Sequence, residues 1–141
     1  MTLNQGLITS KLDLIEQYQR QLTALLELSD AEIISLPAQM AAVERFFQLM
    51  VDSMVDINQH IIRELDLKSA DDLQSTFYPL GKKDILPNDF AQKLAPIVGV
   101  RNRLVHQYED LDKKLFLKNL RDNFSQFETY REFIIKYLSA S

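Results

Sequence analysis

The sequence predicts an all-α protein, an up-and-down bundle of four to five helices. Hydrophobic residues recur every three or four positions through most of the 141 residues, as on one face of a helix. Only three glycines and four prolines occur, so turn signals are scarce and a few long helices are favoured over many short strands. The length suits one domain and no internal repeat divides it, so residues 1–141 are expected to form a single domain.

The first half of the chain contains two long periodic stretches. The first runs from about residue 3 to residue 28 and ends near Ser29, which with Asp30 offers a break. The second extends over residues 40–65, and Pro37 suits its start because the missing N–H needs no partner in a first helical turn. Two long helices are therefore expected here, followed by a polar connection to residue 87.

The second half predicts two further helices. Asn88 is expected to cap the third, and Pro96 and Gly99 are expected to interrupt it just before Arg101. Asp112 is expected to cap the last helix, whose apolar rhythm continues to residue 138. The helix that carries Arg101 should therefore be kinked or loosened.

The composition is that of a soluble cytoplasmic protein. The absence of cysteine excludes disulfide frameworks and thiolate metal sites. The first residues lack a basic segment followed by an apolar core, and no apolar run approaches the roughly 20 residues that span a bilayer. Cytoplasmic localisation without membrane association is expected.

The net charge of −4 has the wrong sign for long-range attraction of nucleic acid. RNA contact would require a local basic cluster, for which the chain offers Lys82, Lys83, Lys93, Arg101 and Arg103. Scattered surface lysines are the alternative interpretation, and Arg103 is equally suited to phosphate or to an acidic neighbour.

The chain has two histidines, His60 and His106. His60 follows Asp56 by four positions, so the two share a helix face. Such a pair suits catalysis or metal binding, but two ligands without a third are a weak metal motif. We predict no metal site and assign no role to Asp56 or His60.

His106 has more polar neighbours. Asn102 lies four positions earlier, on the same helix face, whereas Arg101 lies about 140° round an ideal helix. Tyr108, two positions later, would point away from His106 within a helix. These side chains meet only if the helix ends near His106, if the arginine side chain wraps round, or if a second copy contributes.

These residue types fit RNA cleavage by the ribose 2′-hydroxyl. The reaction needs proton removal, stabilisation of phosphate charge and proton delivery to the leaving oxygen. Histidine suits either proton transfer near neutral pH, and the always-charged arginine suits the phosphate. One histidine per chain is too few for separate acid and base, so the chemistry favours a composite site at a homodimer interface.

Residues 101–108 (RNRLVHQY) resemble the Arg-x4-His-x-Tyr signature of HepT-like proteins in the HEPN superfamily. The resemblance covers most of residues 1–138. It includes the similar segments 43–50, 56–62, 84–87 and 109–112.

This resemblance implies an all-helical HEPN fold, a homodimer and a metal-independent endoribonuclease without a cofactor. It implies the toxin of a type VII HEPN/MNT toxin–antitoxin system, acting on cellular RNA. The implied partner is an MntA-like minimal nucleotidyltransferase antitoxin that transfers AMP to the motif tyrosine. By this resemblance, Arg101 and His106 are catalytic, Asn102 supports them and Tyr108 is modified.

Two other interpretations remain open from the sequence. The chain could be a non-catalytic HEPN module that is the partner or substrate-binding half of a nucleotidyltransferase. It could also be a structural helical dimer in which His106 and Tyr108 only cap or pack.

Overall fold

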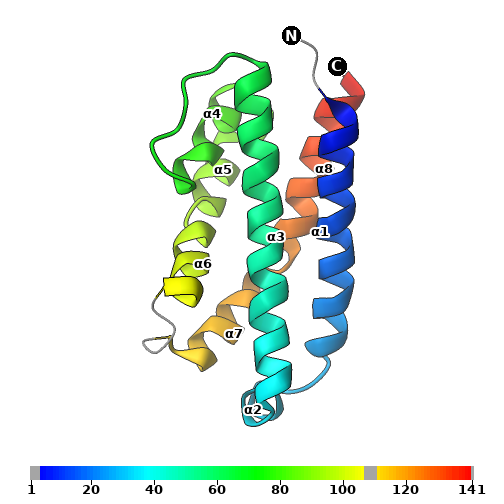
Figure 1. Cartoon of the computed structure of the whole chain (residues 1–141), viewed down its shortest axis with the longest axis vertical. Helices are drawn as coiled ribbons and strands as arrows, with labels where there is room; N and C mark the ends of the chain where they lie inside the picture. Colours follow the sequence, from blue (N-terminus) through cyan, green and yellow to red (C-terminus); the bar gives the residue numbers. More distant parts are fainter. Residues whose placement is uncertain (1–3, 107–110, 141) are drawn as a thin grey trace.

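The computed structural model describes residues 4–106 and 111–140, and within these ranges the regular elements are all helical. Three long helices form the body of the molecule (Figure 1): α1 (Gln5–Leu25), α3 (Pro37–Glu64) and α8 (Ser125–Ala140). Helix α1 packs against both α3 and α8. The all-α bundle predicted from the sequence is therefore confirmed.

Shorter helices complete the bundle. Helix α2 (Asp30–Ser35) joins α1 to α3, and η1 (Gln74–Thr76) leads into α4 (Phe77–Lys82). Helix α4 packs against α5 (Asn88–Leu94). Gly81 permits this packing, because a Cβ there would lie 2.9 Å from the Ala91 Cβ.

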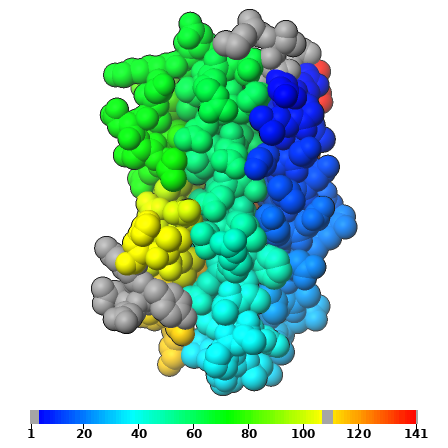
Figure 2. Space-filling view, in the orientation of Figure 1, coloured from blue at the N-terminus to red at the C-terminus, as the bar shows by residue number. Residues whose placement is uncertain are grey.

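Helix α6 (Ile97–His106) continues from α5 and packs against α3, opposite α1 (Figure 2). Helix α7 (Lys113–Asn123) then crosses behind α3 and leads into α8 (Figure 1). Counting α5 with α6 and α7 with α8, the order of helices agrees with the four predicted stretches.

Helix α3 is the centre of the core because its buried residues lie on several faces rather than on one stripe. Apolar side chains from all the neighbouring helices meet it. The fully buried Asn58 side chain provides a polar link among them. It accepts a hydrogen bond from the Tyr130 hydroxyl at 2.6 Å and donates one to Thr76 Oγ1 at 3.2 Å. Helices α3 and α8 and the turn η1 are thereby joined through the interior.

Two predicted helix boundaries are wrong. Gly99 does not interrupt its helix: α6 passes through it, because one glycine costs only about 1 kcal/mol and the buried Val98 and Leu104 side chains hold the helix in place. Asn88 is the first residue of α5 rather than its cap, which is Pro87.

The last predicted helix is divided at Phe124 into α7 and α8. At this point the Asn123 side-chain amide donates a hydrogen bond to the backbone carbonyl of Asn119. This bond competes with the regular backbone hydrogen bonds of the helix. The predicted cap is confirmed, since Asp112 accepts a hydrogen bond from Leu115 N at 3.0 Å. Pro37 likewise begins α3 as expected.

No helix in the described ranges is long and apolar enough to cross a membrane.

Candidate functional site

Helix α6 carries most of the predicted site, and its local sequence explains its position. Pro96 separates it from α5, since proline cannot continue the backbone hydrogen bonds of the preceding helix. Val98 and Leu104, six positions apart, are buried and fix the helix against the core. The polar residues between and beyond them are directed towards α3 or outwards.

Arg101 is directed towards α3, where it meets Asp52. Its Nε donates to Asp52 Oδ1 at 2.9 Å, and the arginine side chain is only 19% exposed. The aspartate is 35% exposed, so solvent screens the pair and its contribution to stability is at most about 1 kcal/mol. The main consequence of the pair is therefore a fixed orientation for the guanidinium group.

Asn102 stands beside this guanidinium group. Its Oδ1 accepts a hydrogen bond from Arg101 Nη1 at 3.2 Å. Within the described part of the chain, Arg101 Nη2 has no hydrogen-bond partner. Two of the three guanidinium nitrogens are thus held by the protein, while Nη2 can bind an anion.

His106 is the last residue of α6 and is exposed. Because α6 is regular from Ile97 to His106, Arg101 and His106 lie about 140° apart round its axis. The kink expected before Arg101 occurs at Pro96 and does not change this. A single chain therefore presents the two side chains in different directions.

The predicted modification site, Tyr108, lies outside the described residues. Lys82 and Lys83 are exposed and follow one another at the end of α4, at the turn into α5, whereas α6 continues from the other end of α5 (Figure 1). Their predicted contact with RNA stays a prediction.

The histidine of α3 has a structural environment. His60 is buried, and its Nε2 accepts a hydrogen bond from the backbone N–H of Asn4 at 3.3 Å. Asp56 is exposed and pairs instead with Lys11 of α1, with 3.0 Å between Oδ2 and Nζ. The two side chains therefore serve separate contacts between α3 and the beginning of the chain.

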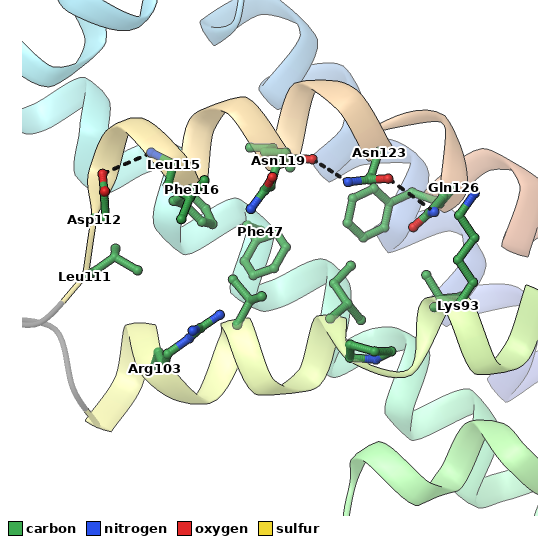
Figure 3. Close-up of a pocket in the computed structure, with 16 residues that line it drawn as sticks. Phe47, Lys93, Arg103, Leu111, Asp112, Leu115, Phe116, Asn119, Asn123 and Gln126 are labelled. Atoms are coloured by element: carbon green, nitrogen blue, oxygen red, sulfur yellow. Dashed lines mark hydrogen bonds between the residues drawn. The ribbon is translucent and has the colours of Figure 1, made fainter.

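A groove with a volume of about 600 Å³ lies on the other side of α6 (Figure 3). Helices α5 and α6 form one wall, and α7 with the start of α8 forms the other. Phe47 of α3 lies at its floor, and Arg103 points into it from α6. The two arginines of residues 101–103 thus face different sides of one helix.

Two parts of this arrangement were not predicted from the sequence. Asp52 is one of several acidic residues in the chain, and its contact with Arg101 spans 49 positions, so only the tertiary structure identifies it. The groove-lining amides Asn119 and Asn123 are four positions apart. That spacing on one helix face was the available signal.

The described residues contain no group of three or more histidine, aspartate or glutamate side chains placed to hold an ion. The polar groups at α6 can offer a cation, an amide and an imidazole to a substrate. That set suits an anionic ligand whose reaction involves proton transfer.

Comparison with known proteins identifies the family. The family model described as Ribonuclease HepT-like matches residues 15–134. The chain belongs to this HepT-like family. The tRNA nuclease HepT of Aphanizomenon flos-aquae is 33% identical over 132 residues, which are 94% of this chain and 90% of that protein.

Two other similarities agree with this assignment. A putative RNase of Archaeoglobus fulgidus is 29% identical over 93 residues, or 64% of this chain and 68% of that protein. The structure of a tri-AMPylated HEPN toxin of Shewanella oneidensis, in complex with an MNT antitoxin, superimposes with a TM-score of 0.85. That match covers 92% of this chain and 97% of the toxin at 19% identity, so it establishes the shared HEPN fold.

Proposed function

We propose that the chain is an RNA-cleaving toxin, a metal-independent endoribonuclease of a type VII HEPN/MNT toxin–antitoxin system. The observation that carries the proposal is the polar end of α6: a guanidinium oriented by Asp52, an adjacent amide at Asn102 and an exposed imidazole at His106. The names of the similar proteins, a tRNA nuclease and a putative RNase, support cleavage of cellular RNA.

The proposed reaction is attack of a ribose 2′-hydroxyl on the adjacent phosphorus. One imidazole removes the hydroxyl proton, the P–O5′ bond breaks, and a second imidazole protonates the departing 5′-oxygen. Arg101 stabilises the charge that develops on the phosphate, and Asn102 supports Arg101. The products are a 2′,3′-cyclic phosphate and a free 5′-hydroxyl.

A homodimer would supply what one chain lacks. Each chain has one histidine at α6, and regular helix geometry separates it from Arg101. A two-fold axis near the end of α6 would bring two imidazoles and two guanidinium groups to one phosphate. We therefore propose a composite site shared by two copies, with Lys82, Lys83 and Arg103 as additional RNA contacts.

The activity is tested by incubating RNA with the purified protein in EDTA. Wild-type protein is expected to degrade the RNA, and His106→Ala and Arg101→Ala are expected to lose about 100-fold or more in rate, as loss of a proton-transfer group or a charge-stabilising donor does. Asp56→Asn, which changes an exposed carboxylate on α3, is the matched control and should retain activity. Intact RNA with wild-type protein would favour a non-catalytic partner of a nucleotidyltransferase.

We further propose that an MntA-like nucleotidyltransferase switches the toxin off by transferring AMP from ATP to Tyr108, releasing pyrophosphate. The modification would add bulk and negative charge where the RNA phosphate must bind. The AMPylated state of the Shewanella toxin, in its complex with an MNT antitoxin, supports this.

Co-expression with such an antitoxin should add one or more AMP masses to the peptide that contains Tyr108, and Tyr108→Phe should remove the adduct. Unmodified wild-type peptide, or an adduct on another residue, would contradict the assignment.

A further inference from the structure

The groove beside α6 has a composition suited to a nucleobase. We propose that it binds one or more bases of single-stranded RNA next to the phosphate that is cleaved. The inference rests on the proposed function for its substrate, but it concerns a surface that lies across α6 from the contact between Arg101 and Asp52.

The groove offers apolar surface to the faces of a base. Phe47 at the floor is buried and is held by edge-to-face contact with Phe116, with ring centroids 5.2 Å apart, so it closes the floor without presenting an open ring face. Half-buried Ile97 and Val100 of α6 form the facing aliphatic wall. Contact with these aliphatic side chains removes apolar surface from water and tolerates any base identity.

The opposite wall offers hydrogen-bonding groups to the edge of a base. Gln126 Nε2 donates to Asn123 Oδ1 at 3.4 Å, and Asn123 Nδ2 donates to the backbone carbonyl of Asn119 at 2.9 Å (Figure 3). These hydrogen bonds orient the side-chain amides of Asn123 and Gln126. The Asn119 side-chain amide has no hydrogen bond within the described residues. Amide side chains carry both donors and acceptors and are typical readers of base edges.

The charges at the ends of the groove complement a phosphate backbone. Arg103 and Lys93 lie at opposite ends of the wall formed by α5 and α6 (Figure 3), and neither has an acidic partner in the described part of the chain. Lys93 belongs to α5 and Arg103 to α6, so the two cations lie on either side of the break at Pro96. Asp112 also lines the groove, but its carboxylate already caps α7.

The groove comes within one helical turn of the proposed catalytic end of α6, because Arg103 lines it. Arg103 lies three positions before His106, so the two are neighbours on the helix surface. A nucleotide whose phosphate lies at His106 can therefore place an adjacent base past Arg103 into the groove. A second copy of the chain is the competing occupant and is an outcome of the test below, whereas the cation at each end of the groove complements a phosphate backbone.

The test uses His106→Ala protein, so that binding is measured without cleavage. Fluorescence anisotropy compares a short mixed-sequence single-stranded RNA with an abasic strand of the same length. Adding Asn119→Ala and Asn123→Ala together should weaken binding of the intact strand about 10-fold, at the lower end of the discrimination that base contacts give, and leave abasic binding unchanged. Lys118→Ala, an exposed change on the same helix, is the control and should alter neither.

Equal affinity of the double-amide variant and its parent for the intact strand would overturn the inference. So would a change in its molar mass by light scattering, which would identify the groove as a subunit interface. Failure of the proposed function is distinguishable: base-dependent binding by a wild-type protein that leaves RNA intact would refute cleavage and retain the groove.

Discussion

At the scale of single residues, the positions of Arg101 and Arg103 follow from helix geometry. Two positions correspond to about 200° round the axis, so the side chains leave α6 on opposite sides. Arg101 meets Asp52 of α3, and Arg103 enters the groove beside α7. Two chemically identical side chains thereby acquire different environments.

Asp52 is expected to act as a positioning residue through Arg101. Asp52→Asn keeps the volume of this side chain and removes its charge, so Arg101 is held at most by a weaker hydrogen bond to an amide oxygen. We expect kcat for RNA cleavage to fall about 10- to 100-fold with little change in KM, since misplaced catalytic groups cost rates of this order. Steady-state kinetics on a short RNA provides the measurement.

The control for this variant is Asp56→Asn, one helical turn further along α3, where the carboxylate pairs with Lys11 instead. Both variants should unfold at nearly the wild-type temperature, because ion pairs that solvent partly screens contribute at most about 1 kcal/mol to stability. Unchanged kcat in Asp52→Asn would show that Arg101 needs no such partner.

Whether the role of a residue can be predicted from the sequence depends on how many positions separate it from its contacts. The role of Asp112 as a helix cap was predictable because its partner, Leu115 N, lies three residues away. The partners of Asp52 and His60 lie 49 and 56 positions away, and nothing in local sequence selects them. Candidate residues for chemistry were therefore predictable by type, whereas the residue that orients Arg101 was not.

At the scale of helices, the buried hydrogen bonds of Asn58 connect elements that are distant in sequence. The Tyr130 hydroxyl of α8 donates to Asn58 Oδ1, and Asn58 donates to Thr76 of η1. Thr76 in turn donates to the Leu73 carbonyl at 2.7 Å. The position of η1, and with it the start of α4, thus depends on α3 and α8.

Tyr130→Phe should reduce the free energy of unfolding by about 1–3 kcal/mol, because Asn58 Oδ1 would remain buried without this donor. Urea denaturation provides the measurement. Tyr18→Phe is the matched control, since the Tyr18 hydroxyl has no hydrogen bond within the described residues. Equal losses in the two variants would contradict a specific role for the buried network.

Tyr130→Phe should also change how the free energy of unfolding depends on pH above about pH 10. Burial raises the pKa of Tyr130 well above its usual value of 10.0, so the folded state keeps this proton where the unfolded state loses it. The associated stability is full below about pH 10 and is lost as pH rises towards the folded-state pKa. Wild-type stability should therefore fall more steeply above pH 10 than that of Tyr130→Phe.

The sequence was sufficient to predict which long helices form, but it was a poorer guide to where each helix begins and ends. Apolar periodicity identified the long helices because it is a local property of the chain. The continuation through Gly99 and the break at Phe124 depend on packing and on a side-chain hydrogen bond. Such effects are decided by the folded structure rather than by local propensity.

At the scale of the whole molecule, the acidic net charge of −4 means that the proposed RNA substrate would have to be attracted by a local cluster of cations. The cations at α6 are suited to this, and a two-fold axis near its end would double their number. The proposed homodimer would therefore meet both the charge requirement and the chemical requirement, with two guanidinium groups for the phosphate and two imidazoles for the two proton transfers.

The central claim is that two copies of α6 form one RNA-cleaving site, and subunit mixing tests it most directly. Wild-type protein is unfolded and refolded with a ninefold excess of His106→Ala, then assayed on RNA in EDTA. If both histidines are needed, activity should fall to about 1% of an equal amount of all-wild-type protein, since only about one dimer in a hundred has two wild-type copies. Combining the two proteins without refolding provides the control. Residual activity of about 10%, proportional to the wild-type fraction, would contradict the need for two histidines in one site, and no RNA cleavage by wild-type protein alone would contradict the function itself.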